Sequence, residues 1–288
     1  MAAISDGGPG EKIMTKRIAV VAFALSALAL SACEEKKQEA PAMNNQPTTA
    51  APTAAAPTAA APTAAAPAAA APAGATQSIK GTVAYTGAPV VMEKINRAVD
   101  PYCAKTPMKE ETLIVNSNKT LANVLVRITK GINTALPPPP STAAQIEQHE
   151  CMYRPRVQGI VAGQPLTIKN ADGTTHNVHT YKGSTTLFNQ AQIAGSAPFE
   201  KTFKDDMAML KFKCDIHPWM TGYVSVTNHP YFAVTGADGS FEIKNVPAGS
   251  YTIEAWQEKL GTKEMPVTVA ADKPAEVKFS YDGTESAK

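Results

Sequence analysis

Short runs of alternating or β-branched apolar residues dominate residues 78–281. The clearest runs are residues 79–85, 124–128, 165–168, 223–226, 240–243, 251–256 and 267–269. Turn residues such as Asp238-Gly239 separate them, and alternation with period two between turn residues is typical of β-strands. Apart from a patch at residues 143–149, no segment repeats with the helical period. The pattern predicts an all-β fold, long enough for two small β-sandwiches.

The N-terminal residues 1–32 have the pattern of an export signal. Lys16 and Arg17 precede an apolar run from Ile18 to Leu30 that is too short for a membrane-spanning helix. Leu30-Ser-Ala-Cys33 resembles a bacterial lipobox, which implies a lipid on Cys33 and anchoring to a membrane of the cell envelope, facing the periplasm. Glu34 after the cysteine favours the outer membrane. An ordinary secreted protein is the alternative.

Residues 33–77 form a linker of Ala, Pro and Thr after the predicted lipid anchor. Between residues 52 and 72 a proline recurs at every fifth position, which leaves no room for a helix to nucleate. A segment with so few large apolar side chains stays disordered and extended. It is interpreted either as a stalk reaching about 110 Å or as a spacer of no selected length.

Charge argues against one class of partner. The chain has 27 Lys and Arg against 25 Asp and Glu, a formal net charge of +2. So small a net charge gives no sign of a nucleic-acid partner.

The stretch from Lys211 to Met220 concentrates soft metal ligands in one loop. It contains Cys214, His217 and Met220, spaced C-x-x-H-x-x-M. Thiolate, imidazole and thioether together select copper rather than calcium or magnesium, and a trigonal copper site needs a second histidine. His176 and His179 are the candidates, and residues three apart on a strand face opposite sides. His176, which follows an Asp-Gly turn, is the predicted ligand.

These residues resemble the blue-copper cupredoxin family of the amicyanin and plastocyanin type. The resemblance rests on His176-Asn-Val-His and Cys214-Asp-Ile-His-Pro-Trp-Met220. It implies a Greek-key sandwich holding one type 1 copper, with His176, Cys214 and His217 as equatorial ligands and Met220 as the axial one. It also implies that the backbone N–H of Asn177 steadies the cysteine sulfur. A metal-free member of the family is the alternative.

A second resemblance covers the C-terminal part, from Phe232 to Trp256. This stretch resembles the carboxypeptidase regulatory-like domain, which implies a transthyretin-like sandwich without catalytic residues. The predicted division is residues 78–148 as a β segment, 149–229 as the cupredoxin and 230–284 as the regulatory-like sandwich. Neither flank alone has enough strands to close a core, so we hypothesise that the cupredoxin is inserted into one sandwich built from both flanks. Two domains in a row are the alternative.

Two cysteines remain once Cys33 is assigned to the lipid and Cys214 to copper. Export places Cys103 and Cys151 in an oxidising compartment, where we expect a disulfide. The alternative is a second metal site using His149 and Cys151, but two ligands rarely suffice.

The loop that carries the copper ligands also carries apolar residues. Ile216, Pro218 and Trp219 could form a docking patch for a redox partner, because aromatic residues are common in interface hot spots. Alternatively, Trp219 packs inward against the metal site.

Together these observations predict an electron carrier and not an enzyme, because four protein ligands leave no open position for a small-molecule substrate. The partner would be a redox protein such as a cytochrome c or a dehydrogenase. The alternatives are copper handling without redox turnover and a structural lipoprotein of the envelope.

Overall fold

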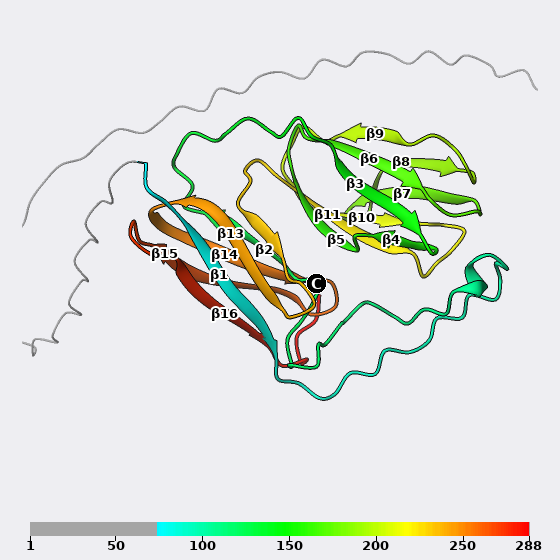
Figure 1. Cartoon of the computed structure of the whole chain (residues 1–288), viewed down its shortest axis with the longest axis horizontal. Helices are drawn as coiled ribbons and strands as arrows, with labels where there is room; N and C mark the ends of the chain where they lie inside the picture. Colours follow the sequence, from blue (N-terminus) through cyan, green and yellow to red (C-terminus); the bar gives the residue numbers. More distant parts are fainter. Residues whose placement is uncertain (1–73, 288) are drawn as a thin grey trace, which may run out of the picture. The chain divides into compact units, whose positions relative to one another are not determined.

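The computed structural model describes residues 74–287, and these residues fold almost entirely as β-strands (Figure 1). The predicted all-β class is therefore confirmed. The export signal, Cys33 and nearly all of the Ala/Pro/Thr linker lie outside the described residues. The predicted linker extends too far, because Thr76 and Gln77 already belong to the first strand. Within residues 74–287, no helix is long and apolar enough to cross a membrane.

Strands from the two ends of the described chain build one sandwich, here called the flank sandwich. One sheet has the order β13-β1-β16 and the other β12-β2-β14-β15. The strands are β1 (Thr76–Tyr85), β2 (Leu125–Lys130), β12 (Phe232–Val234), β13 (Ser240–Pro247), β14 (Gly249–Gln257), β15 (Gly261–Val269) and β16 (Ala275–Tyr281). β1 pairs with β13 and β16, and β2 pairs with β12 and β14. This is the inserted arrangement, in which both flanks contribute strands to one core.

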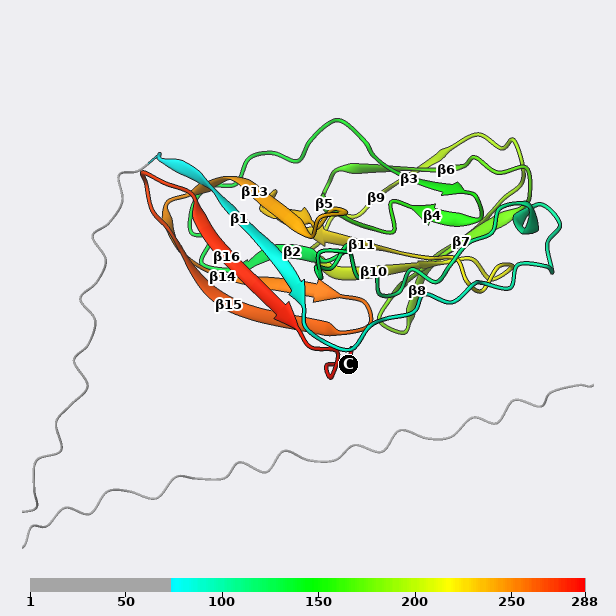
Figure 2. The same ribbon diagram turned by 60° about the horizontal axis from the view of Figure 1, so that its bottom comes forward.

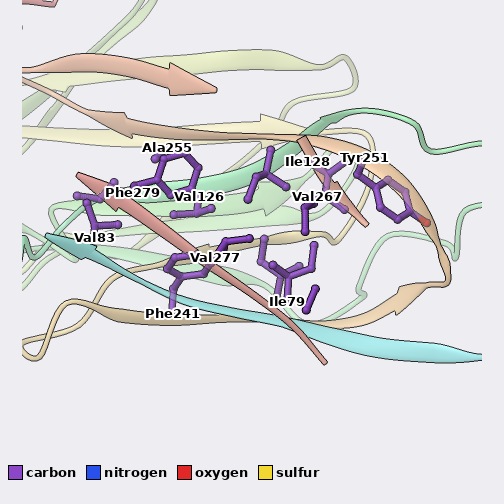
Figure 3. Close-up of a cluster of buried hydrophobic side chains, with 14 of the residues drawn as sticks. Ile79, Val83, Val126, Ile128, Phe241, Tyr251, Ala255, Val267, Val277 and Phe279 are labelled. Atoms are coloured by element: carbon purple, nitrogen blue, oxygen red, sulfur yellow. The ribbon is translucent and has the colours of Figure 1, made fainter. Parts of the chain in front are cut away.

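Alternation of buried and exposed side chains creates the core of the flank sandwich. Along β16 every second residue is buried, from Ala275 to Tyr281. Figure 3 shows side chains from both sheets meeting, among them Ile79, Val126 and Phe279. Each fully buried side chain of this size stabilises the fold by about 1.5–3 kcal/mol.

The strands between β2 and β12 form the central sandwich, which has its own core (Figure 2). Its sheets have the orders β5-β11-β10-β7-β8 and β4-β3-β6-β9. The strands are β3 (Ala144–His149), β4 (Met152–Arg154), β5 (Val157–Val161), β6 (Pro165–Asn170), β7 (His176–Lys182), β8 (Thr185–Gln192), β9 (Phe199–Thr202), β10 (Met207–Lys213) and β11 (Thr221–Thr227).

The patch at residues 143–149 is a strand, so the helical reading of it is wrong. Within β3, Ile146 and Gln148 are buried and their neighbours are more exposed, which is period-two alternation with one polar member. The Gln148 side chain donates from Nε2 to Gln192 Oε1 at 2.6 Å, which gives its amide nitrogen a buried partner. Because β3 pairs in parallel with β6, the central sandwich begins at Ala144 and not at residue 149.

The long connection between β1 and β2 does not stay with the flank sandwich. Figures 1 and 2 show it carrying the short 3₁₀ turn η1 (Cys103–Lys105) to one end of the central sandwich. Tyr102 and Cys103 pack in the core of the central sandwich, although they lie between two strands of the other one. Residues 97–106 are called the cap below.

The two sandwiches also contact each other through a buried ion pair. Arg156 before β5 donates from Nε and Nη2 to Glu258, at 2.5 and 2.8 Å, and both side chains are at most 6% exposed. The ring of Phe232 packs directly against Gly159, where a Cβ would clash with it. These contacts connect the central sandwich to β12 and to the residues between β14 and β15.

Candidate metal centre

His176 is the first residue of β7, and its side chain is fully buried. The Asp172–Thr175 turn before it brings the chain to the end of the sheet. His179, three residues later, is only half-buried and contacts Asp215 and Thr186 instead. The alternation of strand residues thus separates the two histidines as predicted.

The loop from Cys214 to Met220 joins β10 to β11 and is closed by its own backbone. The Cys214 N–H donates to the Met220 carbonyl at 3.3 Å, and the Met220 N–H donates to the His217 carbonyl at 2.9 Å. Cys214, His217 and Met220 are all buried, whereas Ile216 and Pro218 are exposed. The spacing C-x-x-H-x-x-M thus points the three soft side chains away from solvent.

Three of the four predicted ligands present donor atoms to one point. One atom each of His176, Cys214 and His217 lies within 4.8 Å of the others. The two Nδ1 atoms of the histidines are 2.9 Å apart, and Cys214 Sγ is 3.7 Å from His217 Nδ1. Met220 is buried in the same core cluster as Cys214.

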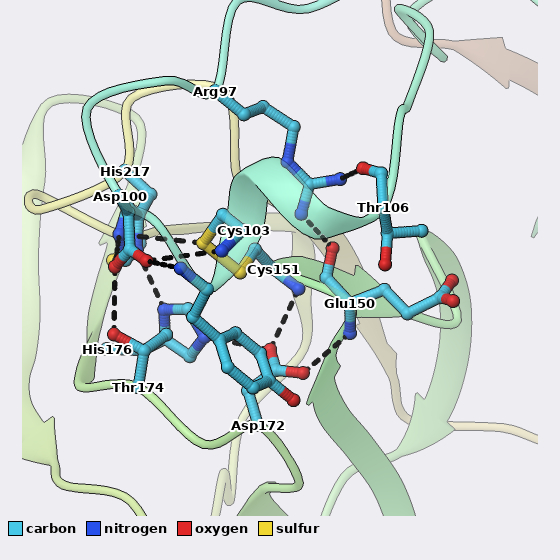
Figure 4. Close-up of a disulfide and its surroundings, with 12 residues drawn as sticks. Arg97, Asp100, Cys103, Thr106, Glu150, Cys151, Asp172, Thr174, His176 and His217 are labelled. Atoms are coloured by element: carbon cyan, nitrogen blue, oxygen red, sulfur yellow. Dashed lines mark hydrogen bonds and ion pairs between the residues drawn. A yellow bond between two sulfur atoms is a disulfide. The ribbon is translucent and has the colours of Figure 1, made fainter.

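The other ring nitrogen of each histidine contacts a carboxylate. His176 Nε2 is 2.8 Å from Asp172 Oδ2, and His217 Nε2 is 3.0 Å from Asp100 Oδ2 (Figure 4). A carboxylate accepts, so each Nε2 carries the proton and each Nδ1 is left with a lone pair. Two lone pairs 2.9 Å apart repel unless a proton or a metal cation lies between them. Carboxylate–histidine pairs of this kind orient metal ligands in proteins.

The pKa shifts of the histidines follow from these contacts. Burial disfavours the charged form of His176, but its hydrogen bonds to Asp172 and Cys214 outweigh burial and raise its pKa. Burial and the nearby charge of His176 lower the pKa of His217, in spite of the Asp100 carboxylate. The metal-free site therefore holds an additional proton on His176 more readily than on His217.

The surroundings of Cys214 favour ionisation of its thiol. Burial alone would raise the pKa of its thiol, but a hydrogen bond with His176 and backbone N–H groups, including that of Asn177, lower it instead. The Asn177 side chain also accepts from the Asp215 N–H at 2.7 Å, which holds the start of the ligand loop. A thiolate is the form that binds a metal ion.

Trp219 packs against the site rather than standing free on the surface. Its ring is 5.1 Å from that of His217, and its Nε1–H donates to the Cys151 carbonyl at 3.1 Å. The Arg97 guanidinium lies 5.9 Å from the ring centroid. These contacts favour the inward-packing interpretation for Trp219. Ile216 and Pro218 are the exposed members of the predicted docking patch.

Cys103 and Cys151 form a disulfide, the pairing that the sequence favoured over a second metal site. Cys151 and Glu150 form the two-residue turn between β3 and β4, and both have positive φ. Their N–H groups donate to the Asp172 carboxylate at 2.8 and 2.7 Å. These hydrogen bonds offset the free-energy cost of the positive φ angles. The disulfide therefore joins the cap to the turn that also holds Asp172.

Sequence reasoning missed Asp100 and Asp172. Asp172 could have been noticed, because it stands four residues before His176 in the Asp-Gly turn. Nothing in the sequence near Asp100 signals a contact with a residue 117 positions away.

Comparison with known proteins gives one family match. Residues 216–277 match the family model described as polysaccharide lyase family 4, domain II. The match starts within the ligand loop and ends within β16, so it covers less than a quarter of the chain. The carboxypeptidase regulatory-like resemblance is not among the matches and stays a prediction. No curated protein matches the chain.

Several solved structures are similar to part of the chain, and they include copper proteins. A purple cupredoxin from Nitrosopumilus maritimus is 27% identical over 29% of this chain and 99% of its own, with a TM-score of 0.27. A mutant of amicyanin in the Cu(I) state is 22% identical over 29% of this chain and 81% of its own, with a TM-score of 0.27. A copper-containing nitrite reductase from Thermus scotoductus is 19% identical over 35% of this chain and 25% of its own, with a TM-score of 0.27. TM-scores this low carry no argument about function, which has to rest on the donor atoms.

Proposed function

We propose that this protein binds one copper ion through His176, Cys214, His217 and Met220 and serves as an electron carrier. The observation that carries the proposal is the facing pair of Nδ1 atoms, 2.9 Å apart, with Cys214 Sγ beside them. Two imidazoles and a thiolate, with a buried thioether nearby, match the donor set of a trigonal copper site. A copper ion held there would supply one-electron chemistry by alternating between Cu(II) and Cu(I).

The surrounding residues support a carrier because they hold the donors in place. Asp172 and Asp100 fix the two rings through Nε2, and two backbone hydrogen bonds close the ligand loop. Small rearrangement between the two oxidation states favours fast electron exchange, and donors on a sheet and a closed loop rearrange little. We expect no turnover of a substrate, and we expect a protein redox partner such as a cytochrome c or a dehydrogenase.

A second candidate is copper retention without rapid electron exchange. The observation that favours it is the burial of His217, which is only 1% exposed because the cap lies over its Nε2 edge. A partner could then reach the ligand loop only through its exposed residues Asp215, Ile216 and Pro218. Anchoring in the cell envelope through Cys33 is part of both proposals.

An absorption spectrum of the purified protein during titration with Cu(II) tests the proposal. We expect an intense visible band from charge transfer between the Cys214 sulfur and Cu(II), at one copper per chain. Cys214→Ser should abolish the band, and His179→Ala should leave it unchanged because His179 faces away. Tight binding without the band would favour retention, and no binding would refute both candidates.

The rate of electron exchange separates the carrier from the retention protein. A copper-loaded sample mixed with a small redox reagent should reach equilibrium within the mixing time of a stopped-flow instrument if the protein is a carrier. Exchange over minutes would favour retention.

A further inference from the structure

The cap contributes to a metal centre that belongs to the other sandwich. It lies between β1 and β2 of the flank sandwich, yet three of its residues contact the site in the central sandwich. Asp100 bonds His217, and Cys103 is joined to Cys151 (Figure 4). Arg97 lies over the Trp219 ring.

Asp100 makes four hydrogen bonds that divide cleanly between its two oxygens. Oδ1 accepts from the N–H groups of Tyr102 and Cys103, at 2.7 and 3.1 Å, and so holds the cap turn. Oδ2 accepts from Thr174 Oγ1 at 2.8 Å and from His217 Nε2 at 3.0 Å, and so reaches into the site. One carboxylate thus connects the conformation of the cap to the orientation of a predicted copper ligand.

The disulfide fastens the cap directly over the same histidine. Cys103 Sγ is 3.8 Å from His217 Nε2, and both cysteines are buried in the core of the central sandwich. Arg97 adds a second attachment, because its guanidinium is buried and donates to the carbonyls of Thr106 and Glu150. With the cap closed, His217 and Cys214 are at most 1% exposed.

We infer that Asp100 is a positioning residue for the metal site and that the Cys103–Cys151 disulfide locks the cap, so that reducing this disulfide opens the site to metal exchange. The inference deepens the proposed function and rests on it for the identity of the metal. Reduction needs a dithiol: its two thiols give two electrons and two protons, the Cys103–Cys151 bond becomes two thiols, and the dithiol becomes a disulfide.

The locking role is tested first on the metal-free full chain, so that the result does not depend on copper. The rate of Cys214 alkylation by a maleimide is measured by mass spectrometry of its peptide. We expect Cys103→Ser/Cys151→Ser to raise this rate at least tenfold, with an unchanged circular dichroism spectrum. Equal rates in the two proteins would overturn the locking role.

A second measurement covers the case in which the double variant does not fold. The wild-type chain is treated with a dithiol at a temperature where its circular dichroism is unchanged, the dithiol is removed without air, and alkylation of Cys214 is followed again. An increase of at least tenfold is expected, and an unchanged rate would overturn the lock. If copper binds, transfer of Cu(I) to a chelator should accelerate by the same factor in the double variant, and an unaltered transfer rate would count against the lock.

The positioning role is tested with Asp100→Ser. Serine keeps an oxygen that can accept from the Tyr102 and Cys103 amides, but it is too short to offer a second oxygen to His217. We expect the slowly exchanging Nε2–H signal of His217, seen by nuclear magnetic resonance in the wild type, to disappear while Cys214 stays protected. The affinity for Cu(I) should fall about 10- to 100-fold, the usual effect of losing such a partner.

Asp272→Ser is the matched control, because Asp272 is an exposed carboxylate in the flank sandwich. It should change neither the His217 signal nor the affinity. A persistent His217 signal together with wild-type affinity in Asp100→Ser would overturn the positioning role. If the chain binds no copper, the His217 signal and the alkylation rates still decide the inference, and the failure lies with the proposed function.

Discussion

Replacing Asp172 by asparagine should weaken copper binding more than it weakens the fold. Asp172 is buried, and its two carboxylate oxygens serve three N–H donors. Oδ2 accepts from His176 Nε2 and from the Cys151 N–H, both at 2.8 Å, and Oδ1 accepts from the Glu150 N–H at 2.7 Å. In Asp172→Asn one oxygen becomes an NH₂ group, which cannot accept any of these protons.

The magnitude follows from counting the lost acceptors. The less costly orientation keeps the amide oxygen at the Oδ2 position, so only the Glu150 N–H loses its partner. One unsatisfied buried donor costs about 1–3 kcal/mol in the free energy of unfolding. The bond to His176 Nε2 also loses its charge assistance, and outer partners of this kind change metal affinity about 10- to 100-fold.

Two measurements check this prediction. Urea unfolding of the metal-free protein gives the loss of stability, and competition with a coloured chelator gives the affinity for Cu(I). Asp272→Asn is the control, because Asp272 is an exposed carboxylate of the flank sandwich, outside the ligand loop. The control should change the affinity less than about threefold, well short of the effect of an orienting partner. Wild-type affinity in Asp172→Asn, or an equal loss in the control, would refute the reasoning.

Two further predictions concern stability. Glu258→Gln should lower the free energy of unfolding by about 3–5 kcal/mol in chemical denaturation, because it strands the buried charge of Arg156. Glu111→Gln, which breaks the more exposed bidentate pair with Arg154, should cost about 0–1 kcal/mol, and equal costs would contradict the burial argument. Burial would raise the pKa of Asp100, but its four hydrogen bonds lower it from 3.8 to about 2. Its carboxylate thus adds about 1 kcal/mol, after solvent screening, that is complete above about pH 4 and is lost as the pH falls towards 2. Acid titration of metal-free Asp100→Ser should show a flatter loss of stability in that window, and an unchanged slope would contradict it.

The strand pattern predicted the all-β class because most strands have one apolar face. Several strands were not among the predicted runs, and for β3 and β4 two physical reasons can be given. Gln148 occupies a core position of β3, where its Nε2 donates to Gln192, so the alternation is not purely apolar. The turn between the two strands is Glu150-Cys151, with positive φ at both residues, where Asn-Gly is the usual signal of such a hairpin.

The arrangement of the ligands was predictable because local geometry decides it. Strand alternation separates His176 from His179, and a seven-residue loop is short enough that Cys214, His217 and Met220 stay together whatever the rest of the chain does. The role of Trp219 was not predictable, because its partners, Arg97 and the Cys151 carbonyl, come from other parts of the chain. Sequence spacing therefore predicts ligands on one element but not the residues that contact them.

Asp100 is a functional example of a contact residue that sequence spacing does not predict. The flank sandwich carries none of the proposed ligands, yet the connection between its strands β1 and β2 supplies the acceptor for His217 and one half of the disulfide. A central sandwich expressed without that connection would keep all four ligand side chains but lose the hydrogen bond that sets the tautomer of one of them. It would also expose His217 to solvent. The insertion of one sandwich into the other therefore contributes to the metal site. It brings a loop of the flank sandwich next to the ligand loop and the first residue of β7, His176.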